Sequence, residues 1–129
     1  MIFESIEFKT EIPRSKEWPD NVFQYCNFKT ISTDTSEILG VFVGCKFEEC
    51  DWYWTLFNLP IFIDVKFIKC TFRGVSFAGV RCVDCEFEGC VFTHDNLGSG
   101  CSFSEISWYC CRDVGCTGLP IEAIKVDVS

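Results

Sequence analysis

A phenylalanine recurs every five residues through the middle of the chain. Residues 40–99 divide into twelve consecutive blocks of five, and nine of them have Phe at the third position, while the other three carry Trp52, Cys82 and Leu97. A helix repeats every 3.6 residues and a strand every two, so neither produces this pattern. A period of five requires a turn every few residues, with the third side chain of each block pointing inward. Each block then makes one short, flat side.

Four such sides close a square coil of twenty residues. Stacked coils make a solenoid, because each coil covers the apolar end of its neighbour. We therefore expect an all-β solenoid of about five to six coils. Residues twenty apart should lie about 4.8 Å from each other, the usual spacing of paired strands. This predicts four core columns: Phe42-Phe62-Cys82, Phe47-Phe67-Phe87, Trp52-Phe72-Phe92 and Phe57-Phe77-Leu97.

The 129 residues predict one domain. We expect regular repeats at 40–99, irregular flanking coils at 1–39 and 100–118, and a C-terminal cap at 119–129. A second five-residue register, interrupted by Pro13, contains Phe3, Phe8, Trp18, Phe23 and Phe28. The register slips by one residue between Phe28 and Phe42, where residues 32–37 predict a loop. It slips again at the glycines of 98–100, and Phe103 and Trp108 then continue it.

Eleven cysteines pose a separate question, because such a density is typical of disulfide-stapled or zinc proteins. Nine occupy the first position of a block, the small inward slot: Cys26, Cys45, Cys50, Cys70, Cys85, Cys90, Cys101, Cys111 and Cys116. Free cysteine is a small, slightly hydrophobic residue that suits this slot. An odd count fits poorly with a closed disulfide framework. The N-terminus does not read as a signal peptide, so we expect a cytoplasmic protein with reduced thiols.

Other uses of the thiols are less well supported by the spacing. Cys82 and Cys85 form a C-x-x-C pair, but a structural zinc site usually needs a second pair, and a redox pair needs a helix N-terminus after a strand. Disulfides along the Cys50-Cys70-Cys90 column stay open as an alternative. We predict no metal and no cofactor.

The blocks CTFRG, CEFEG, CKFEE and VSFAG carry a family resemblance. They resemble the pentapeptide-repeat family, whose blocks read roughly A-[DN]-[LF]-x-x, and the resemblance covers about residues 40–99. It implies a right-handed quadrilateral parallel β-helix. It also implies a binding role, since members of this family include acidic, DNA-like rods that bind type II topoisomerases and small proteins that neutralise toxins.

Catalysis is not expected from the sequence. The single histidine, His94, is at an outward position, and acidic pairs such as Glu86 and Glu88 lie on a convex wall, whereas acid–base catalysis needs a cleft. The net charge of −8 argues against direct nucleic-acid binding and is compatible with a basic protein partner. The sequence contains no run of 18 apolar residues, so it does not predict a membrane-spanning helix.

The outward residues are the candidate partner-binding site. One group is an aromatic and aliphatic stripe, extended by Val41, Val43 and Val83: Tyr53, Trp54, Leu56, Leu59, Ile61 and Ile63. The other is an acidic group that we expect to share one face, partly offset by Lys46 and Lys66: Glu48, Glu49, Asp51, Asp84, Glu86 and Glu88. Either the N-terminal segment or the 32–37 loop covers the stripe, or the stripe is an exposed interface. A homodimer and a heterologous partner are then both open.

These features favour a small bacterial inhibitor or immunity-type protein that neutralises a toxin or an enzyme without catalysis of its own. One alternative is a DNA-mimicking protein that binds a topoisomerase such as gyrase. A second alternative is a structural repeat protein without inhibitory activity.

Overall fold

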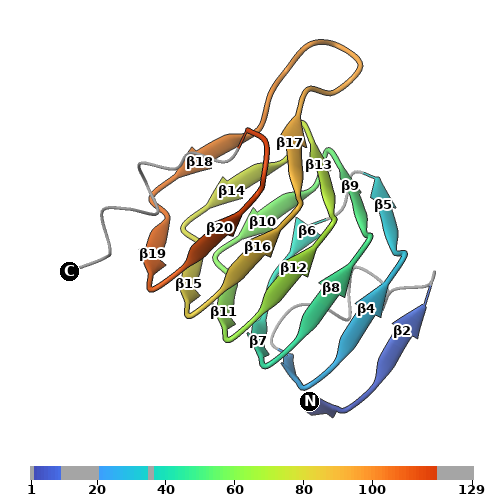
Figure 1. The fold of residues 1–129 in the computed structure, drawn as a ribbon, viewed down its shortest axis with the longest axis vertical. Helices are drawn as coiled ribbons and strands as arrows, with labels where there is room; N and C mark the ends of the chain where they lie inside the picture. Colours follow the sequence, from blue (N-terminus) through green and yellow to red (C-terminus); the bar gives the residue numbers. More distant parts are fainter. Residues whose placement is uncertain (1, 10–20, 35–36, 119–129) are drawn as a thin grey trace.

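Short strands wind into a four-sided parallel β-solenoid (Figure 1). The computed structural model describes residues 2–9, 21–34 and 37–118. Nearly every strand has three residues, and the chain turns a corner after each. Strands on the same side of successive coils pair in parallel and form four sheets, here called faces A to D. The predicted solenoid is confirmed.

Each face is one sheet. Face A contains β1 (Ile2–Glu4), β3 (Val22–Gln24), β7 (Val41–Val43), β11 (Ile61–Ile63), β15 (Arg81–Val83) and β19 (Ser107–Tyr109). Face B contains β2 (Glu7–Lys9), β4 (Asn27–Lys29), β8 (Lys46–Glu48), β12 (Lys66–Ile68), β16 (Glu86–Glu88) and β20 (Arg112–Val114). Face C contains β5 (Ser32–Asp34), β9 (Asp51–Tyr53), β13 (Thr71–Arg73) and β17 (Val91–Thr93). Face D contains β6 (Glu37–Ile38), β10 (Leu56–Asn58), β14 (Ser76–Ala78) and β18 (Ser102–Ser104).

The number of coils is slightly lower than expected. Faces C and D contain four strands each and faces A and B contain six, so the described residues make four complete coils with half a coil at either end. We had expected five to six. The predicted cap at 119–129 and the predicted core position of Trp18 lie outside the described residues. None of the described residues belongs to a helix that could cross a lipid bilayer.

Backbone hydrogen bonds at the corners explain why a block of five closes a side. The fifth residue of a block adopts a left-handed conformation, with φ of 52° at Glu49 and at Lys69. Such a conformation is uncommon for residues other than glycine. It is compensated here because the corner N–H bonds to the next coil, as in the 2.8 Å bond from Glu49 N to the carbonyl of Ile68.

Third-position side chains fill the interior as stacked aromatic columns. In the longest column, Phe8, Phe28, Phe47, Phe67 and Phe87 stack with ring centroids 4.5–4.9 Å apart. Three of the four predicted columns are confirmed. The fourth was wrong at its end, because Phe77 pairs with Phe103 and Leu97 is 79% exposed.

Both predicted slips exist, but the structure places them differently. Residues 32–34 and 37–38 are not a loop: they belong to β5 and β6, with Thr33 opposite Trp52 and Ile38 opposite Phe57. The missing residue lies between Ile38 and Phe42, because the side that contains β6 is one residue short. The second irregularity is an outward loop, residues 94–100, between β17 and β18 (Figure 1). The regular register therefore ends at Thr93 and not at residue 99.

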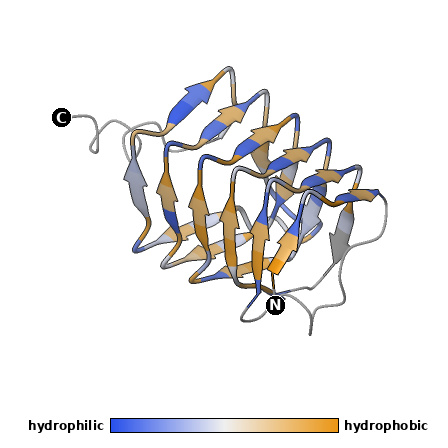
Figure 2. Cartoon of the chain, turned by 90° about the horizontal axis from the view of Figure 1, so that it is seen from below, coloured by the Kyte–Doolittle hydropathy of each residue, from blue (hydrophilic) through white to orange (hydrophobic). Residues whose placement is uncertain are grey.

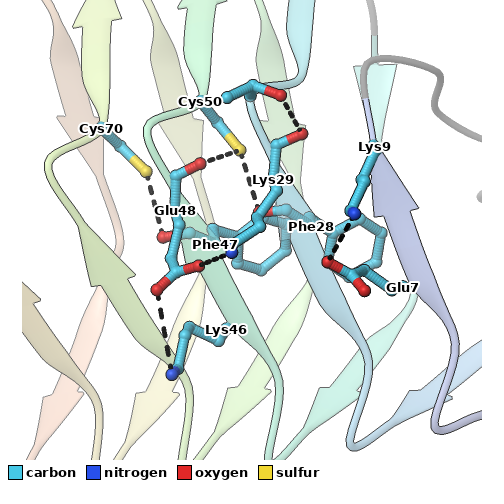
Figure 3. Close-up of polar contacts among 10 residues, drawn as sticks. Glu7, Lys9, Phe28, Lys29, Lys46, Phe47, Glu48, Cys50 and Cys70 are labelled. Carbon is cyan, nitrogen blue, oxygen red and sulfur yellow. Dashed lines mark hydrogen bonds and ion pairs between the residues drawn. The ribbon is translucent and has the colours of Figure 1, made fainter.

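The cysteines occupy the small inward slots, as predicted. Seven of the nine first-position cysteines are buried, and Cys101 and Cys116 are partly buried. Each directs its thiol at a main-chain carbonyl of the preceding coil (Figure 3): the Sγ atoms of Cys50 and Cys70 lie 3.4 Å from the oxygen of Phe28 and 3.3 Å from that of Phe47. A thiol thus adds a weak donor that valine lacks. All eleven cysteines are free.

Thiol reactivity tests this packing role. Cys110 occupies a corner and is exposed, whereas burial raises the pKa of Cys45 to about 11. A buried, protonated thiol is a poor nucleophile. We expect eleven reactive thiols in denaturant without a reductant, and one fast-reacting thiol in the native protein, measured with a chromogenic disulfide reagent. Cys110→Ser should remove the fast phase. A denatured count clearly below eleven would instead indicate native disulfides.

Candidate partner-binding surface

The outer side of face A is the most apolar part of the surface. Valine and isoleucine occupy most outward positions of its central strands: Val22, Val41, Val43, Ile61, Ile63 and Val83. We call these six residues the apolar face. In Figure 2, β7 and β11 are orange along their whole length, whereas β4, β8 and β16 of face B have a hydrophobic centre between hydrophilic ends. An apolar ladder on an outward sheet surface is unusual for a soluble domain and is typical of a contact site.

Large side chains widen the apolar face at both of its corners. Tyr25 and Leu59 are 62% and 67% exposed. Each lies across a corner glycine of the next coil: a Cβ at Gly44 would come within 2.6 Å of the Tyr25 ring, and a Cβ at Gly79 would overlap the Leu59 side chain. The glycines thus let these two side chains lie flat beside the apolar face.

Two shallow hollows flank Leu59. One, of about 350 Å³, lies where the short side of β6 ends and is lined by Leu39, Gly40 and Val41. The other, of about 410 Å³, lies toward the C-terminal end and contains Arg81 and Glu105. Leu59 therefore stands as a ridge between two depressions at the edge of the apolar face.

The predicted apolar stripe does not lie on one face. Its residues follow the coil around three sides: Tyr53 is on face C, Trp54 on the next corner, Leu56 on face D, Leu59 on the corner between faces D and A, and Ile61 and Ile63 on face A. Only Ile61 and Ile63 belong to the apolar face, and Leu59 borders it. The predicted extension by Val41, Val43 and Val83 does lie on the apolar face, whereas Tyr53, Trp54 and Leu56 do not.

A loop that the sequence analysis did not consider contacts Tyr53 and Trp54. The indole Nε1 of Trp54 donates a 2.5 Å hydrogen bond to Asp95 Oδ2, and the main-chain N–H of Asn96 donates to the Tyr53 hydroxyl at 3.2 Å. The two rings stack on each other with centroids 5.3 Å apart. The 94–100 loop therefore lies against this part of the stripe, while residues 10–20 of the N-terminal segment and residues 35–36 lie outside the described residues.

The six acidic candidates are also dispersed, so the prediction of a single acidic face was wrong. Glu48, Glu86 and Glu88 lie on face B, Asp51 on face C, Glu49 and Asp84 on two different corners. Face B is not uniformly acidic, because Lys29, Lys46 and Lys66 lie on it together with the carboxylates. Glu48 lies 3.6 Å from Lys29 and 3.9 Å from Lys46 (Figure 3).

Several of these carboxylates are neutralised within the protein. Asp51 pairs with Arg73 at 2.8 Å, and Glu86 pairs with Arg112 at 2.9 Å. By contrast, Asp64 and Asp84 occupy neighbouring corners beside Ile63 and Val83, and neither has an ion-pair partner among the described residues. Two carboxylates without an ion pair therefore border the apolar face, and Glu49 and Glu88 elsewhere likewise have none among the described residues.

Metal chemistry finds no support in the described part of the chain. No group of three or more His, Cys, Asp or Glu side chains in residues 2–9, 21–34 and 37–118 is arranged to hold a metal ion.

Comparison with known proteins fits this architecture. The family model for pentapeptide repeats matches residues 62–93, with eight copies of the repeat. The chain is a pentapeptide-repeat protein. No curated protein sequence matches it.

Solved structures share the fold of this pentapeptide-repeat protein at low sequence identity. A trypsin-treated form of QnrB1, a plasmid-mediated fluoroquinolone resistance protein, superposes with a TM-score of 0.66 at 15% identity, over 90% of this chain and 69% of that one. The pentapeptide-repeat protein Rfr23 from the cyanobacterium Cyanothece 51142 gives a TM-score of 0.53 at 10% identity, over 92% of this chain and 84% of that one. At such identities the likeness shows a common fold only.

Sequence reasoning missed several surface residues of this pentapeptide-repeat protein. Tyr25 and Val22 were assigned to an irregular flank, so they were not considered as part of the surface of face A. Asp64 could have been found by extending the corner position of Asp84 back by twenty residues. Asp95 gave no repeat signal because it lies in the 94–100 loop.

The loop depends on one carboxylate. Asp95 accepts hydrogen bonds from Trp54 Nε1 and from the N–H groups of Leu97 and Ser99, and the Trp54 bond in particular lowers the pKa of this carboxyl. The contact is therefore present above the ordinary aspartate pKa and is lost as the pH falls through the lowered value. Asp95→Asn should speed amide hydrogen exchange at Leu97 and Ser99 by about tenfold or more. The matched variant Asp84→Asn should leave these rates unchanged, and equal rates in both variants would refute this role.

Proposed function

We propose that this pentapeptide-repeat protein is a non-enzymatic binding protein, a small cytoplasmic inhibitor or immunity-type protein that docks a protein partner through the apolar face. The observation that supports this best is the ladder from Val22 to Val83, whose side chains stay only partly buried although the interior is already filled with aromatic rings. An apolar patch of this kind gains free energy when a partner covers it.

The distribution of charge supports the same surface. Asp64 and Asp84 beside the apolar face have no ion pair in the part of the chain that the structure describes, whereas on face B Glu48 and Glu86 are paired and Glu88 is not. Unpaired rim charges steer association and select a partner of opposite charge. The partner is therefore expected to be basic around an apolar centre.

The experiment compares two surface variants with the wild type as immobilised baits. Ile63→Asp places a charge in the apolar face, and the double variant Glu86→Lys with Glu88→Lys reverses charge on face B. We expect a protein that is retained by the wild type and by the face B variant but lost with Ile63→Asp, measured by quantitative mass spectrometry. The retained protein should also lose its toxicity or activity when the wild type is co-expressed, and regain it with Ile63→Asp.

Two outcomes would contradict the proposal. If every retained protein is lost equally from both variants, face A is not the specific surface. If the retained protein keeps full activity in the presence of the wild type, the protein binds but does not inhibit, as expected of a structural repeat protein.

The topoisomerase alternative is favoured by the net charge of −8 and by the rod-like fold that the chain shares with QnrB1. The lysines of face B, two of which pair with Glu48, speak against a ladder of unpaired negative charges like that of DNA. A gyrase supercoiling assay distinguishes the two proposals: inhibition that depends on the carboxylates of face B, and not on Ile63, would support the DNA mimic.

A further inference from the structure

We infer that the segment which docks on the apolar face is an amphipathic helix of the partner, with basic residues along one flank. This inference rests on the proposed function and specifies the chemistry of its partner. It follows from three properties of face A: its backbone hydrogen bonding, its dimensions and the one-sided placement of its charges.

The backbone of face A has no free hydrogen-bonding edge to offer at the apolar face. The central strands β7, β11 and β15 are each paired on both sides. A partner on this surface meets side chains only, so it has to satisfy its own main-chain groups. A helix does so internally while presenting a stripe of apolar side chains, whereas an extended strand gains its affinity from an open sheet edge.

The dimensions suit a helix that lies along the solenoid axis. At the usual strand spacing of about 4.8 Å, the four strands that carry the apolar face span about 14 Å and the six strands of face A about 24 Å, the length of about 16 helical residues. Across the face, Tyr25 and Leu59 border the apolar face on its two corners. Apolar side chains of the helix can enter the hollows on either side of Leu59.

Charge defines which flank of the helix is basic. Asp64 and Asp84 lie side by side on the corner between faces A and B and have no cationic partner among the described residues. At the opposite corner, Glu105 and Arg81 line the same hollow, so the two formal charges of that hollow cancel. Lysine or arginine on the flank above the two aspartates would be attracted, and acidic residues there would be repelled.

The test uses a synthetic probe, a 16-residue helix with leucine on one face and lysine on one flank, beside the same peptide with glutamate in place of lysine. Binding is followed through the methyl resonances of valine, leucine and isoleucine in the full-length protein. We expect the lysine peptide to shift Val41, Val43, Ile61, Ile63 and Val83, and the glutamate peptide to shift none of them at the same concentration.

Matched variants separate this site from general attraction to an acidic protein. Ile63→Asp should lower the affinity for the lysine peptide by about tenfold or more, because it places a charge at the centre of the contact. The double variant Asp64→Asn with Asp84→Asn should lower the same affinity by about three- to tenfold. Glu86→Gln with Glu88→Gln removes the same charge from face B and should change the affinity less than twofold.

Three results would overturn the inference: equal binding of both peptides, equal loss with both double variants, or shifts confined to other faces. So would a dimer in sedimentation velocity that Ile63→Asp dissociates, since a second copy would then occupy the apolar face. Failure of the probe leaves the proposed function standing if the bait experiment still shows a partner lost with Ile63→Asp. If the peptide probe and the bait experiment both fail, the proposed function is refuted as well.

Discussion

Replacing Phe67 by alanine is expected to lower the free energy of unfolding by about 3–5 kcal/mol. Phe67 is 2% exposed and stacks between Phe47 and Phe87 at 4.9 and 4.8 Å, with Phe62 and Phe72 against its sides. The alanine variant has a cavity where the Phe67 ring was. This cavity cannot collapse fully, because the neighbouring coils are held in place by their own strand pairing. Urea denaturation followed by circular dichroism measures the loss.

The neighbouring residue is the control for that measurement. Lys66 precedes Phe67 in the same strand, and its side chain is exposed. Lys66→Ala should change the free energy of unfolding by no more than about 0.5 kcal/mol. If Phe67→Ala also stays within that range, the five-residue register proposed for the core is wrong.

Inserting one alanine between Phe67 and Ile68 should be at least as damaging, with a loss of about 3 kcal/mol or more. The extra residue either bulges out of β12 and breaks its pairing with β8 and β16, or moves later blocks by one position and turns core rings outward. Both results remove buried aromatic contacts. Urea denaturation again gives the magnitude.

The same insertion has a natural control site. The side that contains β6 is one residue short, and a hollow lies beside Leu39 and Gly40 at its end. An alanine inserted between these two residues restores a block of five, so the free energy of unfolding should change by no more than about 1 kcal/mol. Similar losses at both sites would mean that the short side is itself required for the fold.

The repeat made most of the fold predictable from the sequence. A residue such as Phe67 is placed by its neighbours five and twenty positions away, so the core columns and the cysteine slots follow from counting. Counting fails where the block length changes. Leu97 keeps the spacing of five from Phe92 and was placed in the core, but the chain leaves the coil after Thr93 and the next core residue on that side is Phe103.

The surface was less predictable because it depends on side-chain contacts between coils. Counting in twenties correctly placed Val41 and Val83 beside Ile61 and Ile63, but it grouped them with Tyr53, Trp54 and Leu56, which lie on other sides of the coil. Likewise, Glu48 and Asp84 look equivalent in the sequence. Only the structure shows that Glu48 is paired with lysines and that Asp84 borders the apolar face without a cation.

The most direct test of this account introduces the same charge at two adjacent residues of β11. Phe62 points inward and is 1% exposed, whereas Ile63 points outward from the apolar face. Phe62→Asp should leave the protein unfolded in the absence of denaturant, because a buried, unpaired charge costs more than the fold can supply. Ile63→Asp should keep the free energy of unfolding within about 1 kcal/mol of the wild type. If Ile63→Asp unfolds the protein as Phe62→Asp does, then Ile63 is a core residue and face A is not an exposed docking surface.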